Sequence, residues 1–234
     1  MSKFGEGIEV AMNKTDKILR DISKCLNRKT NIHSMRSIIY QNIFFSLYGD
    51  YENIRDKCRR SKDTIANDQK QYPYIPLSSY RFDMMLDYIE KTYGRRESFI
   101  DVGCGVGDKT LLAKLSGSFE KSCGIEYDEV SYNIAIKKTQ KFMDDIDKSN
   151  FNPRYPSFIH GDAFKHSFKP YDTVYLYCPL SSDEMMQKLM NHIYDTINKG
   201  SIICFFNAGM DMKKWMKGKD VYIDIDNGFY IIRK

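Results

Sequence analysis

Seven residues, Asp101-Val-Gly-Cys-Gly-Val-Gly107, constrain the possible fold of this chain more than any other stretch. They follow the short apolar run Ser98-Phe-Ile100, which is typical of a strand, and precede Asp108–Leu115, which is typical of a helix. A strand, a glycine-rich turn and a helix in this order let the backbone approach a ligand and point helix N–H groups at it. The stretch therefore predicts a ligand-binding turn, and a tight turn without a ligand is the alternative.

A second acidic position favours a nucleotide-like ligand. Cys123-Gly-Ile-Glu126 is typical of a second strand that ends in an acid, 19 residues after Gly107. In open α/β folds, an acid at this place accepts hydrogen bonds from ribose hydroxyls. Asp101 stands at the end of the preceding strand, two residues before the first glycine.

The Asp-x-Gly-x-Gly-x-Gly turn and Glu126 together resemble the class I methyltransferases that depend on S-adenosylmethionine (SAM). The nicotinamide Rossmann pattern Gly-x-Gly-x-x-Gly fits less well, because it needs glycine at 108, where this chain has Asp. The resemblance covers about residues 72–234 and implies an enzyme that transfers a methyl group from SAM. A nicotinamide-dependent Rossmann enzyme is kept as an alternative.

The element order expected from the sequence agrees with that class. A helix is expected over 80–92, with Ser78 or Ser79 as its N-cap. The expected strands are 98–102, 121–126, about 156–160, 172–177 and 201–206, and the expected helices are 108–116, 128–146, 182–198 and 210–217. Residues 220–225 and 228–232 predict a closing hairpin around Asn227-Gly228. The prediction is an α/β fold with a mostly parallel seven-stranded sheet and helices on both faces; the resemblance implies strand order 3-2-1-4-5-7-6.

The first part of the chain lies outside the resemblance. We expect residues 1–71 to form a helical cap or extension on a SAM-binding domain over 72–234, with helices at 7–28, 33–48 and 50–67. Residues 1–75 contain 14 Lys/Arg and 9 Asp/Glu, a surplus of +5, whereas the remainder contains 22 of each. This surplus would attract an acidic macromolecule, although a solvated helix face explains it more simply.

The resemblance implies a cofactor site at the carboxyl ends of the first two strands. Asp101 would hold the ammonium group of SAM, directly or through water. The turn would admit the methionine chain, because it has glycine at three positions: Gly103, Gly105 and Gly107. Glu126 would bind both ribose hydroxyls, and Tyr127 would lie against the adenine.

His160-Gly-Asp162-Ala-Phe164 follows the third strand and resembles the family's Gly-Asp-Ala/Phe motif. There the acid accepts a hydrogen bond from the adenine amino group, and the next residue's N–H reaches a ring nitrogen. This implies cofactor-binding roles for Asp162 and Ala163. A turn or N-cap role is the alternative for Asp162.

Tyr177-Cys-Pro-Leu180 follows the fourth strand, at the position from which the class addresses its methyl acceptor. The stretch lacks the Asp/Asn/Ser-Pro-Pro-aromatic motif of enzymes that methylate base amino groups, and the Pro-Cys order of cytosine-C5 enzymes. Cys178 is therefore expected to be a packed thiol. The catalytic residues stay unknown. Tyr177, Tyr72 and Tyr74 are candidates for lining the acceptor channel, with ordinary packing as the alternative, and Tyr177 also counts among the expected cofactor-binding residues.

A narrower resemblance, to the non-SET histone-lysine methyltransferases, rests on the basic N-terminal part, the aromatic-proline loop 72–79, the glycine turn and Gly-Ile-Glu126. The chain departs from that family after the fourth strand, where the family has an Asn-containing stretch, and it matches the loop motif poorly. A protein side chain, an RNA and a small molecule all remain open as acceptors. The departure also motivates an alternative, a catalytically silent SAM-binding subunit that docks a partner through its N-terminal helices.

Composition excludes several other classes of protein. The six cysteines form no Cys-x-x-Cys pair and the four histidines show no metal-ligand spacing, so we expect reduced thiols and no metal site. No stretch approaches the roughly 18 apolar residues of a membrane helix, and no membrane partner is expected. Without a signal-like start, the expected location is the cytoplasm, or the nucleus in a eukaryote.

Overall fold

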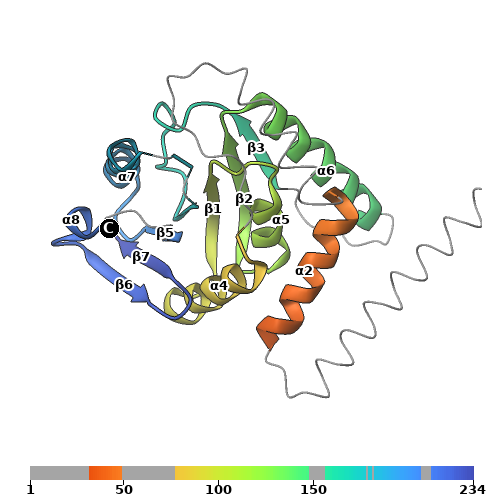
Figure 1. Cartoon of the computed structure of the whole chain (residues 1–234), viewed down its shortest axis with the longest axis horizontal. Coiled ribbons are helices and arrows are strands. Elements are labelled where there is room, and N and C mark those ends of the chain that lie inside the picture. The colour runs from red at the N-terminus through yellow and green to blue at the C-terminus, as the bar shows by residue number, and fades with distance from the viewer. Residues whose placement is uncertain (1–31, 49–76, 148–155, 178, 181, 207–211) are drawn as a thin grey trace, which may run out of the picture.

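The computed structural model describes residues 32–48, 77–147, 156–177, 179–180, 182–206 and 212–234. These residues form one seven-stranded sheet in the order β3-β2-β1-β4-β5-β7-β6 (Figure 1). The strands are β1 (Arg96–Val102), β2 (Phe119–Glu126), β3 (Ser157–His160), β4 (Thr173–Leu176), β5 (Ile202–Phe206), β6 (Asp220–Asp224) and β7 (Phe229–Arg233). The fold class and strand order expected from the sequence are confirmed.

The sheet is parallel from β3 to β5 and antiparallel at its β7–β6 edge. β5 pairs with β7, and a tight turn returns the chain from β6 to β7. Gly228 adopts a positive φ of 73° in this turn, which explains the glycine there. The four central parallel strands bring their carboxyl ends to one edge, where open α/β sheets bind their ligands.

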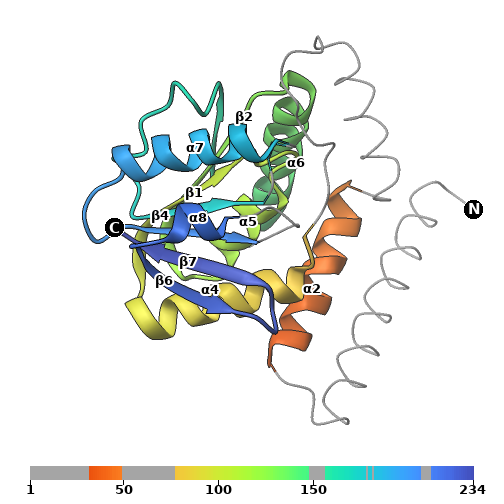
Figure 2. The same cartoon turned by 60° about the vertical axis from the view of Figure 1, so that its left-hand side comes forward.

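Helices cover both faces of the sheet. They are α2 (Ile32–Tyr48), α4 (Ser79–Tyr93), α5 (Asp108–Leu115), α6 (Glu129–Asp147), α7 (Asp183–Thr196) and α8 (Lys213–Met216). Figure 2 shows α4 and α7 on opposite sides of the sheet. Every described helix begins and ends within a few residues of its expected bounds. Ser78 occupies the expected N-cap position of α4, although its side chain makes no capping hydrogen bond.

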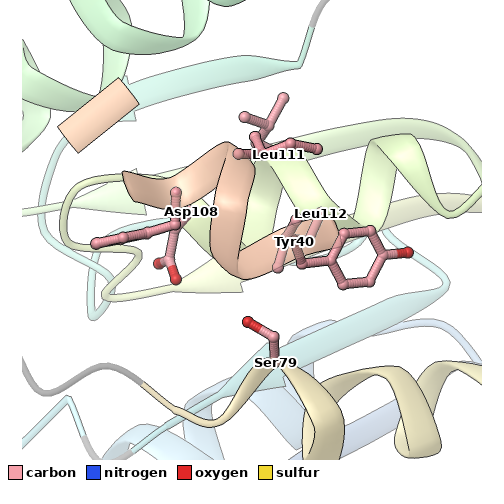
Figure 3. Close-up of a pocket in the computed structure, with 7 residues that line it drawn as sticks. Tyr40, Ser79, Asp108, Leu111 and Leu112 are labelled. Atoms are coloured by element: carbon pink, nitrogen blue, oxygen red, sulfur yellow. The ribbon is translucent and has the colours of Figure 1, made fainter. Parts of the chain in front are cut away.

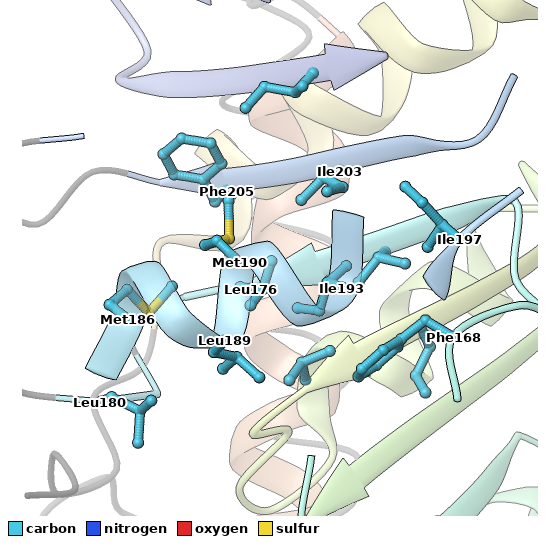
Figure 4. Close-up of a cluster of buried hydrophobic side chains, with 14 of the residues drawn as sticks. Phe168, Leu176, Leu180, Met186, Leu189, Met190, Ile193, Ile197, Ile203 and Phe205 are labelled. Carbon is cyan, nitrogen blue, oxygen red and sulfur yellow. The ribbon is translucent and has the colours of Figure 1, made fainter. Parts of the chain in front are cut away.

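Alternating strand residues build two separate cores. Phe99 and Tyr175 point to the α4 side, where Phe82, Met85 and Ile89 of α4 are buried against them. Ile100 and Leu176 point to the other side and pack with α7, whose Leu189, Met190 and Ile193 are almost inaccessible (Figure 4). Each buried side chain of this size contributes roughly 1.5–3 kcal/mol, so both faces hold the central strands in place.

Helix α2 confirms the expected helix at 33–48 and packs against α4 and α6. The expected helices at 7–28 and 50–67 lie outside the described residues, as do Tyr72 and Tyr74. The division at residue 71 stays a prediction. Among the residues that the structure describes, no helix is long and apolar enough to cross a bilayer.

Candidate functional site

The turn between β1 and α5 lies directly above the ends of β1 and β2. The backbone N–H groups of Gly103 and Cys104 both donate to the carbonyl of Ile125, at 2.9 and 3.1 Å. The three glycines of the turn all adopt positive φ, at 73°, 57° and 81° for Gly103, Gly105 and Gly107. Side chains with a Cβ rarely adopt this conformation, so the backbone alone explains why glycine stands there.

Two of these glycines also make room for protein side chains. A Cβ added to Gly103 would lie 2.6 Å from Cβ of Pro179, and one added to Gly107 would lie 2.6 Å from Cε1 of Phe158. Both distances are shorter than van der Waals contact. The expectation that these glycines serve ligand approach is therefore incomplete, because they also let the ends of β3 and β4 close against the turn.

Gly124 of β2 has a packing role that was not predicted from the sequence. A Cβ at this position would lie 2.6 Å from Sγ of Cys104 and 2.8 Å from Oγ1 of Thr110. Gly124 therefore lets the turn and the start of α5 settle onto β2. A glycine inside a strand is the signal that indicates such a close approach.

Glu126 lies at the carboxyl end of β2, and its side chain is held by two backbone N–H groups. Gly105 N donates to Oε2 at 2.7 Å, and Asp128 N donates to Oε1 at 2.8 Å. The residue is only 6% exposed. These two hydrogen bonds fix the orientation of the carboxylate at the edge of the sheet where open α/β folds bind their ligands. The structure thus places Glu126 and the glycine turn together, as the sequence predicted.

Asp101 is buried beneath the same turn. Its Oδ2 accepts a hydrogen bond from Thr110 Oγ1 at 3.1 Å. Burial, and then the negative charge of Asp108, raise the pKa of Asp101 to about 8. The positive charge of Lys109 opposes this shift and that of Glu126 adds to it. A cationic ligand group beside Asp101 would favour its charged form.

A buried ion pair at the start of α5 was not predicted from the sequence. Lys109 Nζ lies 2.6 Å from Oδ2 of Asp108, and both side chains are less than a tenth exposed. The same ammonium lies 5.8 Å from the ring centroid of Phe82 on α4. Asp108 had been noted only as the residue that replaces a glycine of the nicotinamide pattern. A lysine directly after that acid was the available signal.

The residues after β3 are drawn towards Glu126, whose carbonyl accepts from Gly161 N at 3.0 Å. Asp162 Oδ1 accepts from the N–H of Phe164 at 2.9 Å, which is the turn geometry that had been the alternative for this residue. Ala163 packs against the core on the α7 side. The expected adenine contacts of Asp162 and Ala163 stay predictions.

Two aromatic candidates occupy different surroundings. Tyr127 is 39% exposed, directly after Glu126, so its ring is free to meet a ligand. Tyr177 follows β4 and is half-buried, with its ring 6.3 Å from that of Phe206 in an edge-to-face arrangement. Tyr72, Tyr74 and Cys178 lie outside the described residues. Within the described part of the chain, no group of three or more His, Cys, Asp or Glu side chains is placed to hold a metal ion.

Solved structures share this arrangement of strands and helices. Magnesium protoporphyrin IX methyltransferase from Synechocystis PCC 6803, solved with SAM, is 15% identical, with a TM-score of 0.51, covering 82% of this chain and 88% of that one. An RNA methyltransferase from Salinibacter ruber, solved with S-adenosylhomocysteine, is 19% identical, with a TM-score of 0.48, covering 68% and 92%. A search of curated proteins found none that matches.

The seven-stranded fold is that of the class I SAM-dependent methyltransferases, as the sequence had indicated. More particularly, the family model of the histone methylation protein DOT1 matches residues 78–211, more than half of the chain. The chain therefore belongs to the DOT1 family. This agrees with the narrower resemblance to non-SET histone-lysine methyltransferases, and SAM is the cofactor of the class.

Proposed function

We propose that this protein is a SAM-dependent methyltransferase that methylates lysine side chains of a protein. Membership of the DOT1 histone methylation family supports the protein acceptor. The surplus of +5 in residues 1–75 supports an acceptor complex with an acidic surface. A protein side chain is one of the three classes of methyl acceptor that the sequence left open.

The main support for the SAM site is the position of the Glu126 carboxylate, which accepts hydrogen bonds from Gly105 N and Asp128 N at 2.7 and 2.8 Å. From this position at the end of β2, Glu126 would hold the two ribose hydroxyls of SAM. Asp101 would face the ammonium group, which supplies the positive charge that this buried carboxyl lacks. Tyr127 and the Asp162-Ala163 stretch would hold the adenine.

Bound SAM supplies a methyl group on a positively charged sulfur, ready for in-line transfer to a nucleophile. The protein has to orient the acceptor and exclude water. A lysine must lose its proton before it can attack, and an apolar surrounding lowers the pKa of an ammonium group. Tyr177, half-buried after β4 with its ring against Phe206 of the core, would contribute to such a surrounding.

Calorimetric titration with SAM tests the cofactor site. We expect micromolar binding by the wild type and binding at least about tenfold weaker in Glu126→Gln, which keeps the shape but removes a charge-assisted acceptor. Glu120→Gln is the matched control, because Glu120 lies on the same strand but at its other end, half-exposed and paired with Arg95. Equal affinities in wild type and Glu126→Gln would contradict the assigned ribose site.

Methyl transfer to lysine is tested with radiolabelled SAM and four acceptors: free core histones, nucleosomes, RNA and a small-molecule extract. Label on lysine in histones or nucleosomes would support the proposal, whereas label only in RNA or small molecules would overturn it. The stretch Tyr177-Cys-Pro179 favours a second candidate, the silent subunit. That candidate predicts SAM binding with no labelled acceptor unless a second chain is added.

A further inference from the structure

Helix α2 lies beside the glycine turn although it belongs to the part of the chain outside the class resemblance. Tyr40, Phe44 and Leu47 on one side of α2 are each less than a tenth exposed. Tyr40, Phe44, Ser79 of α4 and Asp108 of α5 surround one small pocket (Figure 3). The hydroxyl of Ser79 and the carboxylate of Asp108 face the same space. The N-terminal part of the chain thus reaches the start of α5.

One residue of the turn packs into this contact. Val106 is completely buried and forms one apolar cluster with Phe44, Leu47 and Leu111. It stands between Gly105 and Gly107, which both have positive φ. Glycines leave the chain conformationally free, so the packing of the Val106 side chain adds to the backbone hydrogen bonds of Gly103 and Cys104 in holding this turn in place.

The position of the glycine turn affects the candidate ribose-binding residue, Glu126, because Gly105 donates a hydrogen bond to it. Its N–H donates to Glu126 Oε2 at 2.7 Å. A displacement of Val106 would move the neighbouring N–H and weaken its hydrogen bond to the carboxylate. Phe44 is therefore connected to Glu126 through two adjacent residues of the turn.

Polar contacts fix where α2 sits along α4. Asp83 of α4 is fully buried, and Arg36 Nη1 lies 3.7 Å from its Oδ1. Tyr40 forms a hydrogen bond with the same carboxylate. These contacts favour one register of α2 on α4, because a buried carboxylate is costly unless a charged or hydrogen-bonding partner lies beside it. They place Phe44, which lies one helical turn after Tyr40, against the glycine turn.

We propose that α2 is part of the cofactor site and that Phe44 is a positioning residue, which holds the glycine turn in its SAM-binding conformation through Val106. The proposal rests on the proposed function, because it assigns the turn to SAM. It predicts that loss of the Phe44 ring affects SAM binding more than turnover.

The test compares SAM affinity in Phe44→Ala, Phe44→Leu and Phe45→Ala. We expect a dissociation constant about tenfold or more higher in Phe44→Ala, because small misplacements of a binding group are costly. Phe44→Leu should recover part of the affinity. Phe45→Ala is the matched control, since Phe45 is the next residue but 49% exposed, and its affinity should stay within about twofold. In turnover, KM for SAM should rise in Phe44→Ala by a larger factor than kcat at saturating SAM falls.

A double-mutant cycle keeps the proposal testable if Phe44→Ala does not fold. Phe44→Leu and Val106→Ala should each weaken SAM binding, and their combination should weaken it by less than the product of the two effects, because both act through one contact. Independent effects, or wild-type affinity in both single variants, would overturn the proposal. Absence of SAM binding by the wild type would instead refute the proposed function, so the two failures are distinguishable.

Discussion

Asp101 is a carboxyl group in a place where a negative charge is unfavourable. It is 3% exposed, and the acids nearest to it, Asp108 and Glu126, add to the effect of burial. Its pKa of about 8 means that most of the ligand-free protein carries a proton on Asp101 at neutral pH. Such perturbed groups gather at functional sites, since a ligand can supply the missing charge.

Asp101→Asn should make stability less sensitive to pH. The pKa of Asp101 is raised in the folded protein above its ordinary value of 3.8. Its contribution is therefore fully present below pH about 4 and is lost as pH rises towards about 8. We expect the wild type to lose several degrees more in Tm between pH 5 and pH 8 than Asp101→Asn, at about 1.4 kcal/mol per pK unit. Parallel losses in thermal unfolding scans of the two proteins would contradict the assignment.

The same residue predicts a pH effect on SAM binding. An ammonium group binds the ionised form of Asp101, so binding must release the proton that the free protein holds. Affinity of the wild type should therefore rise between pH 6 and pH 7.5, measured by calorimetry. Asp101→Asn should bind SAM more weakly and with a flatter profile over this range, and a wild-type profile that falls instead would exclude the role.

At the scale of elements, the sequence predicted each described helix and strand, because apolar periodicity and glycine punctuation are local signals. The strand order came from the resemblance rather than from the residues. Local patterns did not predict the contact of Phe44 with the Val106 cluster or the Asp108–Lys109 pair under Phe82. These depend on which helix faces meet, and that is decided by packing between residues far apart in the chain.

Gly124 allows β2, the glycine turn and α5 to pack closely together. Gly124→Ala should destabilise the protein by about 2 kcal/mol, because its Cβ would overlap Cys104 and Thr110 in a packed core. Gly161→Ala is the control, since a Cβ there would meet its nearest atom at an ordinary 3.6 Å. Denaturant unfolding measures both free energies. A Gly124→Ala protein as stable as Gly161→Ala would show that the turn can move away from β2.

At the scale of the whole molecule, the excess positive charge and the candidate cofactor site lie in different parts of the sequence. Residues 76–234, which contain the strand-end acids, carry no net charge, whereas residues 1–75 carry the whole surplus of +5. Helix α2 lies within the basic part and also packs beside the glycine turn. Helix α2 therefore connects the basic part of the sequence with the cofactor site.

This separation predicts that salt weakens binding of the acceptor but not binding of SAM. Raising NaCl from about 50 to about 200 mM should increase KM for nucleosomes several-fold, because the release of counterions from an acidic polymer gains less entropy at higher salt. KM for SAM should change by less than about twofold, since its contacts are buried. Replacing Lys57, Arg59, Arg60 and Lys62 by Gln should raise KM for nucleosomes at low salt and flatten its salt dependence. Steady-state kinetics with labelled SAM measure both constants, and turnover on nucleosomes that ignores salt in the wild type would show that the basic segment is only a solvated surface.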